Sequence, residues 1–373
     1  MKKINWKSIV VLAIAVLVAI GIVSINVYKQ KDEKKNDKPV VKIGVTLPLT
    51  GSMAKLGKDT QRALQIRLSE IPEESKYQYK LIFEDDQLQS SKEFANAQKL
   101  INFNNVDVMI SGFSGGASAI ADLADKAQVV YWNFQWTDEI VKKSPYVFSF
   151  ILVPKDVAKA WLDVAYQRGV RKIAIINNEA HAGGEYVIAA IKELLPNYPD
   201  MEIVGIEHIP LFGSDLRTTL LKMNAKKPDI YLATLLNPTL DEFGKKMKEQ
   251  NITTPISSIN RFEHSRNKEL FEGNWAVGEE DYNEKLFAIY KERYKEDFDA
   301  SLGAFVYDAF DMMIQAYEQS DHKLSGKELA NRLLEQETFN SGFGVAKMDE
   351  NGLLHAPVVV GEMHDEKFVP VEK

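Results

Sequence analysis

Apolar positions follow two periods in turn along this chain. Residues 41–47 form an apolar run rich in β-branched side chains, which predicts a strand packed on both faces. Residues 48–52 contain Pro, Thr, Gly and Ser and predict a loop, and residues 57–71 then follow the period of an amphipathic helix. Because parallel sheets bind ligands at the loops after their strands, residues 48–57 are a candidate ligand loop.

The same order of strand and helix repeats in two series. In the first series the pattern predicts strands at 79–84, 106–110 and 129–132 and helices at 91–103 and 119–127. In the second it predicts strands at 172–176, 202–209, 229–234 and 255–259 and helices at 156–168, 185–195, 215–225 and 238–250. The chain is therefore expected to have an α/β fold with two parallel sheets, each covered by helices on both faces.

The last third is more helical and ends in a different pattern. Residues 283–294 and 302–319 have strong apolar stripes, and the run from Ser325 to Glu328 is a capping box that predicts the start of another helix. Asn351-Gly352 predicts a hairpin turn, and a further strand is expected at 358–360.

The N-terminus has a pattern of its own. Lys2, Lys3 and Lys7 precede an uncharged apolar run at 8–28, which at ~1.5 Å per residue can cross a hydrocarbon layer of ~30 Å. The positive flank predicts that the remainder lies outside the cytoplasm. We therefore expect residues 1–28 to be a membrane anchor, with cleavage as a signal sequence near Gly21 as the alternative. Residues 29–39 are expected to be a charged linker.

Composition narrows the classes of function. The chain has 373 residues, enough for two domains, and a net charge of −7 without a basic stripe, which argues against a nucleic-acid partner. It has no cysteine, so disulfides, thiolate catalysis and cysteine metal sites are excluded. We find no His/Asp/Glu spacing typical of a metal site and no phosphate-binding loop, so we expect neither cofactor nor ATP hydrolysis.

The run from Gly112 to Gly116 allows three interpretations. It fits G-x-S-x-G between a strand and a helix, as in a hydrolase nucleophile elbow with Ser114 as nucleophile. No histidine stands in a recognisable hydrolase context. The same run can be a helix N-terminus whose N–H groups and Ser114 hydroxyl hold a ligand, or simply a tight turn between strand and helix.

The segment from Tyr131 to Thr137 is unusual because Trp132, Phe134 and Trp136 alternate at the end of a predicted strand. One interpretation is core packing. The other is an aromatic wall against which a ligand stacks, because binding sites form at such strand ends.

An ordered set of motifs runs along most of the chain beyond Pro39. It comprises IGVTLPLTG at 43–51, YKLIFEDDQ at 79–87, DVMISGFSGGASAIADLA at 107–124, PYVFSF at 145–150, GVRKIAII at 169–176 and AFVYDAF at 304–310. This set resembles the branched-chain amino-acid-binding family, the type I periplasmic substrate-binding proteins of ABC transporters. The resemblance implies two Rossmann-like lobes, residues 40–151 with 281–344 and residues 152–280 with 345–373. It places the three hinge crossings near 150–153, 277–282 and 343–347.

The resemblance also implies a ligand site. We expect it to include Leu56, Ser114, Gly115, Gly116, Trp132, Phe134, Gln135, Trp136, Glu179, His181, Ala182, Leu236 and Asn260. Gly115 stands where amino-acid binders of the family have a carboxylate-holding serine, and Phe134 and Trp136 replace alanine and threonine. Ala182 and Leu236 replace tyrosines, and Asn260 replaces a glutamate.

The polar clamp for an amino acid is thus largely missing, which favours a flatter or less charged solute such as an aromatic acid or an amide. Asn178, Arg261 and Glu263 are further candidates for polar contacts.

The sequence therefore predicts a monomeric extracytoplasmic solute-binding protein, not an enzyme. It would capture an amino acid, an amide or an aromatic acid by hinge closure. The resemblance implies delivery to an ABC permease with its ATPase subunits. The alternative is a membrane-anchored sensor ectodomain of the same fold that signals ligand to a partner.

Overall fold

The structure is a computed structural model that describes residues 38–112, 115–135, 139–179, 181–210, 216–259, 262, 265–279, 284–298 and 301–371. The predicted anchor at 1–28 and nearly all of the linker at 29–39 lie outside these residues, as do Ser114, Trp136 and Asn260. Across the described ranges, no helix combines the length and apolar character needed to span a membrane.

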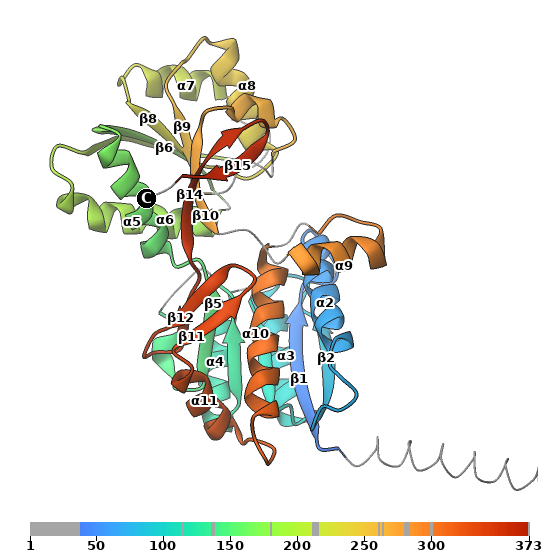
Figure 1. Cartoon of the computed structure of the whole chain (residues 1–373). Coiled ribbons are helices and arrows are strands. Elements are labelled where there is room, and N and C mark those ends of the chain that lie inside the picture. Colours follow the sequence, from blue (N-terminus) through green and yellow to red (C-terminus); the bar gives the residue numbers. More distant parts are fainter. Residues whose placement is uncertain are drawn as a thin grey trace, which may run out of the picture.

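The first of two sheets has eight strands in the order β11-β12-β13-β5-β4-β3-β1-β2 (Figure 1). Its strands are β1 (Val40–Leu47), β2 (Gln78–Asp85), β3 (Val108–Ser111), β4 (Val130–Asn133), β5 (Val147–Ile151), β11 (Thr338–Ser341), β12 (Gly344–Met348) and β13 (Leu353–His355). Neighbours from β2 to β13 are parallel, and β11 and β12 extend the edge as an antiparallel meander.

Helices cover both faces of this sheet. The first face packs on α2 (Ala54–Ser69), α10 (Ser301–Glu318) and α11 (Gly326–Glu335), and α9 (Glu284–Tyr294) lies beside α2. The second face packs on α3 (Ser90–Asn102) and α4 (Ala117–Ala127). Side chains alternate along β4, so Trp132 packs in the hydrophobic core of the first face and Tyr131 in that of the second face. This is expected for a strand buried on both faces.

The second sheet has seven strands in the order β15-β14-β10-β9-β8-β6-β7. They are β6 (Lys172–Asn178), β7 (Glu202–Ile209), β8 (Ile230–Thr234), β9 (Ile256–Ser258), β10 (Trp275–Glu279), β14 (Val358–His364) and β15 (Lys367–Pro370). One face packs on α5 (Pro154–Gln167) and α6 (Ala182–Leu194), the other on α7 (Leu216–Asn224) and α8 (Thr239–Glu249). The predicted α/β class with two mostly parallel sheets is confirmed.

Between the two sheets the described chain crosses after β5, after β10 and after β13. The last crossing corrects our expectation. We placed it at 343–347, but it follows His355, so residues 345–355 belong to the first sheet and not to the second lobe. The reason is the predicted Asn351-Gly352 turn, which folds β13 back against β12 and lets Leu353 pair in parallel with Ser149 of β5.

The predicted capping box is also confirmed. The Ser325 hydroxyl accepts a hydrogen bond from the Glu328 backbone N–H, and the Glu328 carboxylate accepts one from the Ser325 backbone N–H at 2.8 Å. Hydrogen bonds from Ser325 and from His322 lower the pKa of Glu328 to about 2. This carboxylate therefore stays ionised at the positive end of α11.

Candidate functional site

In the first lobe, the loops after β1 and β2 are tied to each other through Asp85. Its carboxylate accepts hydrogen bonds from the backbone N–H of Leu49 at 2.9 Å and of Gln87 at 3.0 Å, and from the Thr50 hydroxyl at 2.6 Å. Burial raises the pKa of Asp85, but these hydrogen bonds outweigh burial and lower it. With the backbone N–H of Thr50, four donors thus bind the single Asp85 carboxylate, and these hydrogen bonds fix the candidate loop at 48–57.

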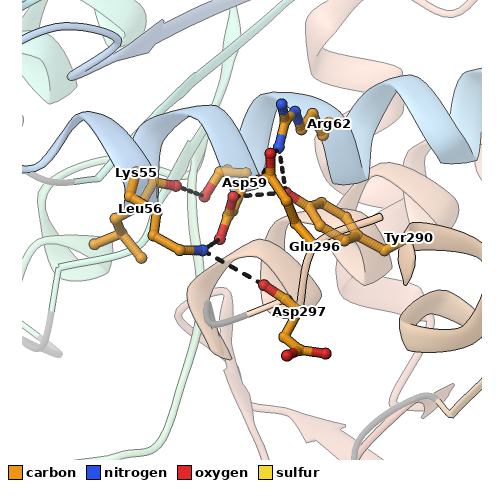
Figure 2. A network of polar contacts seen from close by, with 8 residues as sticks. Lys55, Leu56, Asp59, Arg62, Tyr290, Glu296 and Asp297 are labelled. Carbon is orange, nitrogen blue, oxygen red and sulfur yellow. Dashed lines mark hydrogen bonds and ion pairs between the residues drawn. The ribbon is translucent and has the colours of Figure 1, made fainter. Parts of the chain in front are cut away.

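Leu56 lies on α2 and not in the preceding loop. Its carbonyl accepts the Thr60 hydroxyl at 2.9 Å, and its partly buried side chain packs on the core, directed away from Tyr290 (Figure 2). The next residue, Gly57, lies so close to the loop that a Cβ there would sit 2.3 Å from the carbonyl oxygen of Pro48. A glycine at 57 is what lets α2 start directly beneath the candidate loop.

The glycine run after β3 is a close-packed turn. A Cβ on Gly112 would lie 2.7 Å from the Cβ of Phe134, and a Cβ on Gly116 would lie 2.5 Å from Oε2 of Glu93. The backbone N–H of Gly116 donates to that same Oε2 at 2.8 Å, and Glu93 is fully buried. A protein carboxylate therefore occupies one of the N–H groups at the start of α4 that we expected to hold ligand.

These contacts favour the tight-turn interpretation at Gly112 and Gly116. Gly115 is at the surface, with only the Ser90 hydroxyl near its missing Cβ. The role of Ser114 stays a prediction because this residue lies outside the described ranges.

Trp132 and Phe134 belong to the core and not to an open aromatic wall. Trp132 is fully buried, with its ring stacked on Phe134 at 6.3 Å between centroids and tilted against Phe148 at 5.5 Å. Phe134 is 2% exposed. Gln135 is the described residue of this segment that reaches the surface, and its N–H donates to Oδ1 of Asn133 at 3.4 Å.

In the second lobe, two buried asparagines end β6 and organise the neighbouring strand ends. Oδ1 of Asn178 accepts the backbone N–H of Leu236 at 2.8 Å, and its amide nitrogen donates to the carbonyl of Ile209 at 3.4 Å. Oδ1 of Asn177 accepts the Thr234 hydroxyl at 2.6 Å. The ends of β6, β7 and β8 are thereby held in one fixed arrangement.

His181 lies at the start of α6, against the end of β8. Its Nδ1 is 2.9 Å from the carbonyl oxygen of Thr234. Since a carbonyl can only accept, Nδ1 carries the proton of this hydrogen bond. Burial lowers the pKa of His181, so its ring is neutral at pH 7.

Glu185 follows one helical turn later, where its carboxylate connects two more groups. Oε1 accepts from the amide of Asn177 and lies 2.7 Å from Nε2 of His208 on β7. A Cβ on Gly184 would lie 2.2 Å from Oδ1 of Asn177, so only glycine lets α6 approach the end of β6 this closely.

The remaining predicted residues of this lobe have different surroundings. Glu179 is exposed directly after β6, Ala182 begins α6, and Leu236 is fixed through its N–H by Asn178. Arg261 and Glu263 lie outside the described residues, as does Asn260. The structure thus brings His181 and Leu236 together around β6 and β8.

Sequence reasoning did not single out Asn177, Thr234 and Glu185, which complete this network. The only signal for them is their position at the carboxyl ends of strands, or in the first turn of the helix after one.

Comparison with known proteins agrees with this architecture. The sequence profile of a family described as periplasmic binding protein matches residues 40–367. A Brucella abortus protein, "Leu/Ile/Val-binding protein homolog 7", is 22% identical over 208 residues, which are 52% of each chain. The chain thus spans about half the length of the curated relatives it matches.

Solved structures match over a larger share of the chain. A solute-binding protein of an ABC transporter from Rhodopseudomonas palustris BisB5, in complex with 3,4-dihydroxybenzoic acid, is 20% identical with a TM-score of 0.74, covering 89% of this chain and 96% of that one. An ABC transporter substrate-binding protein from Desulfitobacterium hafniense, in complex with Leu, is also 20% identical, with a TM-score of 0.71 and coverage of 89% and 100%. At this identity the structural matches show a shared fold, and the family profile over residues 40–367 confirms the resemblance that the sequence predicted.

Proposed function

The chain belongs to the periplasmic binding protein family, and from this membership we propose that it is the extracytoplasmic solute-binding component of an ABC transporter. It captures a small organic solute between its two lobes and delivers it to a permease, whose own ATPase subunits supply the energy. The observation that carries this proposal is the pair of mostly parallel sheets whose strand-end loops are pre-organised by polar side chains at the ends of the strands. Asp85 fixes the loops of the first lobe, and Asn177 and Asn178 fix those of the second.

The proposed contact residues follow from what reaches the surface at these loops. On the first lobe they are Gly115 and Gln135, with Ser114 and Trp136 carried from the sequence. On the second lobe they are Glu179, His181 and Leu236, with Ala182 and Asn260 carried from the sequence. Three predicted residues would support the loops without contacting the ligand: Trp132, Phe134 and Leu56. Trp132 and Phe134 are buried, and Leu56 packs on the core.

Capture by this protein would proceed through hinge closure. Two of the crossings between the lobes run side by side, since β13 pairs with β5 up to the residue where each strand ends, at His355 and Ile151. Rotation about these crossings can bring the two sets of loops together. A ligand that contacts both lobes binds the closed form more tightly than the open form, and that difference drives closure.

A sensor ectodomain of the same fold is the second candidate. The apolar N-terminal run predicts a permanent anchor, which suits a receptor that stays at the membrane. Co-purification from the native membrane separates the two roles. Transport predicts a permease and an ATPase bound to the chain, and sensing predicts a signalling protein instead.

The decisive test of solute binding is thermal unfolding of the full chain in mild detergent against amino acids, aromatic acids and small amides. A ligand at about 100 times its dissociation constant should add ~2.7 kcal/mol to the free energy of unfolding. For a protein of this size that raises the midpoint by roughly 5 to 10 °C. A panel in which no solute raises the midpoint would contradict the proposed function.

A further inference from the structure

The N-terminal end of α6 presents two hydrogen-bond acceptors that no described residue uses. His181 donates through Nδ1 to Thr234, and its Nε2 has no hydrogen-bond partner among the described residues. Glu185 uses Oε1 for Asn177 and His208, while its Oε2 has no such partner in the same part of the chain. We propose that these two acceptors, His181 Nε2 and Glu185 Oε2, determine specificity for a solute that offers an amine or primary amide nitrogen to the second lobe.

Geometry fixes the direction of both groups. A closed ring of contacts runs from the His181 ring to the Thr234 carbonyl, from the Thr234 hydroxyl to the Asn177 amide, and from that amide to Glu185. Glu185 follows His181 by four residues, and its backbone N–H donates to the His181 carbonyl at 3.2 Å. The shared contacts with Asn177 and Thr234 therefore hold both side chains at the same ends of β6 and β8.

The tautomer of His181 is set by its partner. The Thr234 carbonyl accepts only, so the ring proton of the neutral imidazole must be on Nδ1, and Nε2 is left with a bare lone pair. Burial favours this neutral ring. A solute N–H can donate to it, whereas a carboxylate has no proton to offer.

Charge near these acceptors points the same way. Two acidic residues lie here: Glu179 directly follows β6, and Glu185 is in the first turn of α6. A carboxylate brought to this face would meet negative charge and unpaired acceptors, while an ammonium or amide group would form charge-assisted hydrogen bonds to Glu185.

The first lobe agrees with this preference. A helix N-terminus is where a solute carboxylate would be expected to bind, and the Gly116 N–H at the start of α4 is already taken by the buried Glu93. In the part of the chain that the structure describes, one N–H at the start of α4 is thus already used by the protein, whereas His181 Nε2 and Glu185 Oε2 at the start of α6 are not. This inference rests on the proposed function and names the solute class for the same site.

Matched probes test it directly on the full chain. We would measure thermal shifts and isothermal titrations with benzamide against benzoate, isovaleramide against isovalerate, and benzylamine against ethylbenzene. Each amide or amine is expected to bind at least about 10-fold more tightly than its partner, because a site built for a donor rejects an analogue that lacks one. Binding of carboxylates alone would overturn the inference and leave the proposed function standing.

Variants assign the effect to the two side chains. His181→Leu should weaken binding of the amide about 10-fold, the loss of one buried hydrogen bond, and His181→Gln, whose carbonyl can replace Nε2, should restore most of it. Glu185→Gln should weaken amine binding more than amide binding, since it removes the charge. His322→Gln, on the other lobe between α10 and α11, is the matched control. Unchanged amide affinity in His181→Leu would overturn the role of this residue.

Two readouts do not depend on fold stability. Long-range ¹H–¹⁵N spectra of the free protein should show His181 with a protonated Nδ1 and a bare Nε2, and the opposite tautomer would overturn the inference. Amide affinity should be constant above pH ~6.5 and fall below it as the ring takes a second proton, with Glu179, Glu185 and His208 as the other titrating groups nearby. That fall should be absent in His181→Gln.

A thermal-shift panel in which no amine or amide raises the unfolding midpoint also overturns the inference. A raised midpoint with another solute would then still support solute binding.

Discussion

The phenolic oxygen of Tyr290 on α9 lies 2.6 Å from the carboxylate of Asp59 on α2 (Figure 2). Asp59 is 1% exposed, and Lys55 approaches its other oxygen at 2.6 Å. Nη1 of Arg62 donates to the same phenolic oxygen at 2.8 Å. The contact joins α2, which follows the candidate ligand loop, to α9, which follows the crossing after β10. It therefore fixes one end of the hinge to the site.

Removing that hydroxyl should therefore destabilise the protein. Burial and the hydrogen bond to Asp59 raise the pKa of Tyr290 to about 12, so the phenol remains a donor at neutral pH. We expect Tyr290→Phe to lower the free energy of unfolding by about 1–3 kcal/mol, because it leaves a buried carboxylate short of a donor. Urea unfolding measures this loss. Tyr294→Phe is the control, since the Tyr294 ring stacks against Arg62 without a hydroxyl hydrogen bond among the described residues. Equal losses in the two variants would contradict the role of the Asp59 contact.

The two adjacent glycines before α4 should respond differently to alanine. A Cβ on Gly116 would lie 2.5 Å from Oε2 of Glu93 and 3.1 Å from the Ser90 carbonyl, so the buried Glu93 carboxylate must move and the Ser90 carbonyl must give way slightly. We expect Gly116→Ala to cost about 1–3 kcal/mol. Gly115→Ala meets only the Ser90 hydroxyl, at 3.0 Å, which can rotate away, and it should cost less than about 0.5 kcal/mol. Thermal and urea unfolding of both variants measure the difference, and similar costs would show that α4 is not packed on Glu93.

The sequence predicted most of the fold because apolar periodicity reports burial directly. The predicted strand at 202–209 matches β7 residue for residue, and the capping box at Ser325 opens α11 as expected. The resemblance, by contrast, places a crossing near 277–282, whereas the structure has strand β10 over Trp275–Glu279. A five-residue strand buried on both faces shows no alternation, so its apolar run cannot be told from a hinge segment.

The site was less predictable because its chemistry depends on pairs distant in sequence. Nothing in the residues around Gly116 indicates that Glu93, 23 positions earlier, occupies its N–H. Trp132 looked like a ligand contact because it stands near a strand end, yet Phe134 and Phe148 enclose it. Whether a residue at a strand end points to solvent or into the core is set by tertiary packing.

Asp308 should make stability fall as the pH rises. Burial of this carboxyl, which lies on α10, raises its pKa to about 7. The Gly342 backbone N–H, which donates to it at 2.8 Å, lowers the pKa but does not outweigh burial. The folded state thus binds the proton more tightly than the unfolded state does. The stabilisation is complete below pH ~4 and decreases as the pH rises towards about 7, by up to about 4 kcal/mol.

Asp308→Asn tests this directly, since the amide oxygen can still accept from Gly342 while the titration is lost. Urea unfolding at pH 5 and pH 8 should show a smaller decrease in the variant than in the parent chain. Asp321→Asn, an exposed carboxyl, should leave the decrease unchanged. An equal decrease in the parent and Asp308→Asn would contradict the prediction.

An ion pair between His355 and Asp156 links the two hinge crossings that run side by side. Its contribution to stability decreases as the pH rises, whereas that of an ion pair which lowers a carboxylate pKa decreases as the pH falls. Nδ1 of His355, at the end of β13, lies 2.6 Å from Asp156 in the first turn of α5, and Asp349 lies 3.9 Å from Nε2. The hydrogen bond to Asp156 raises the pKa of His355, although partial burial opposes it, and Lys347 stands opposite in register. Because the folded pKa is raised, the pair stabilises fully below pH ~6.5 and is lost as the pH rises through the folded value.

Asp156→Asn should therefore lower stability by about 0.2–1 kcal/mol at pH 5.5, as for other partly exposed pairs, and by less at pH 8.5. NMR titration should show a lower pKa for His355 in this variant than in the parent chain. Since the pair spans the crossing between the lobes, the loss at low pH should appear as faster hydrogen exchange at residues 151–156. An unchanged His355 titration would mean that Asp156 does not hold the imidazolium across the hinge.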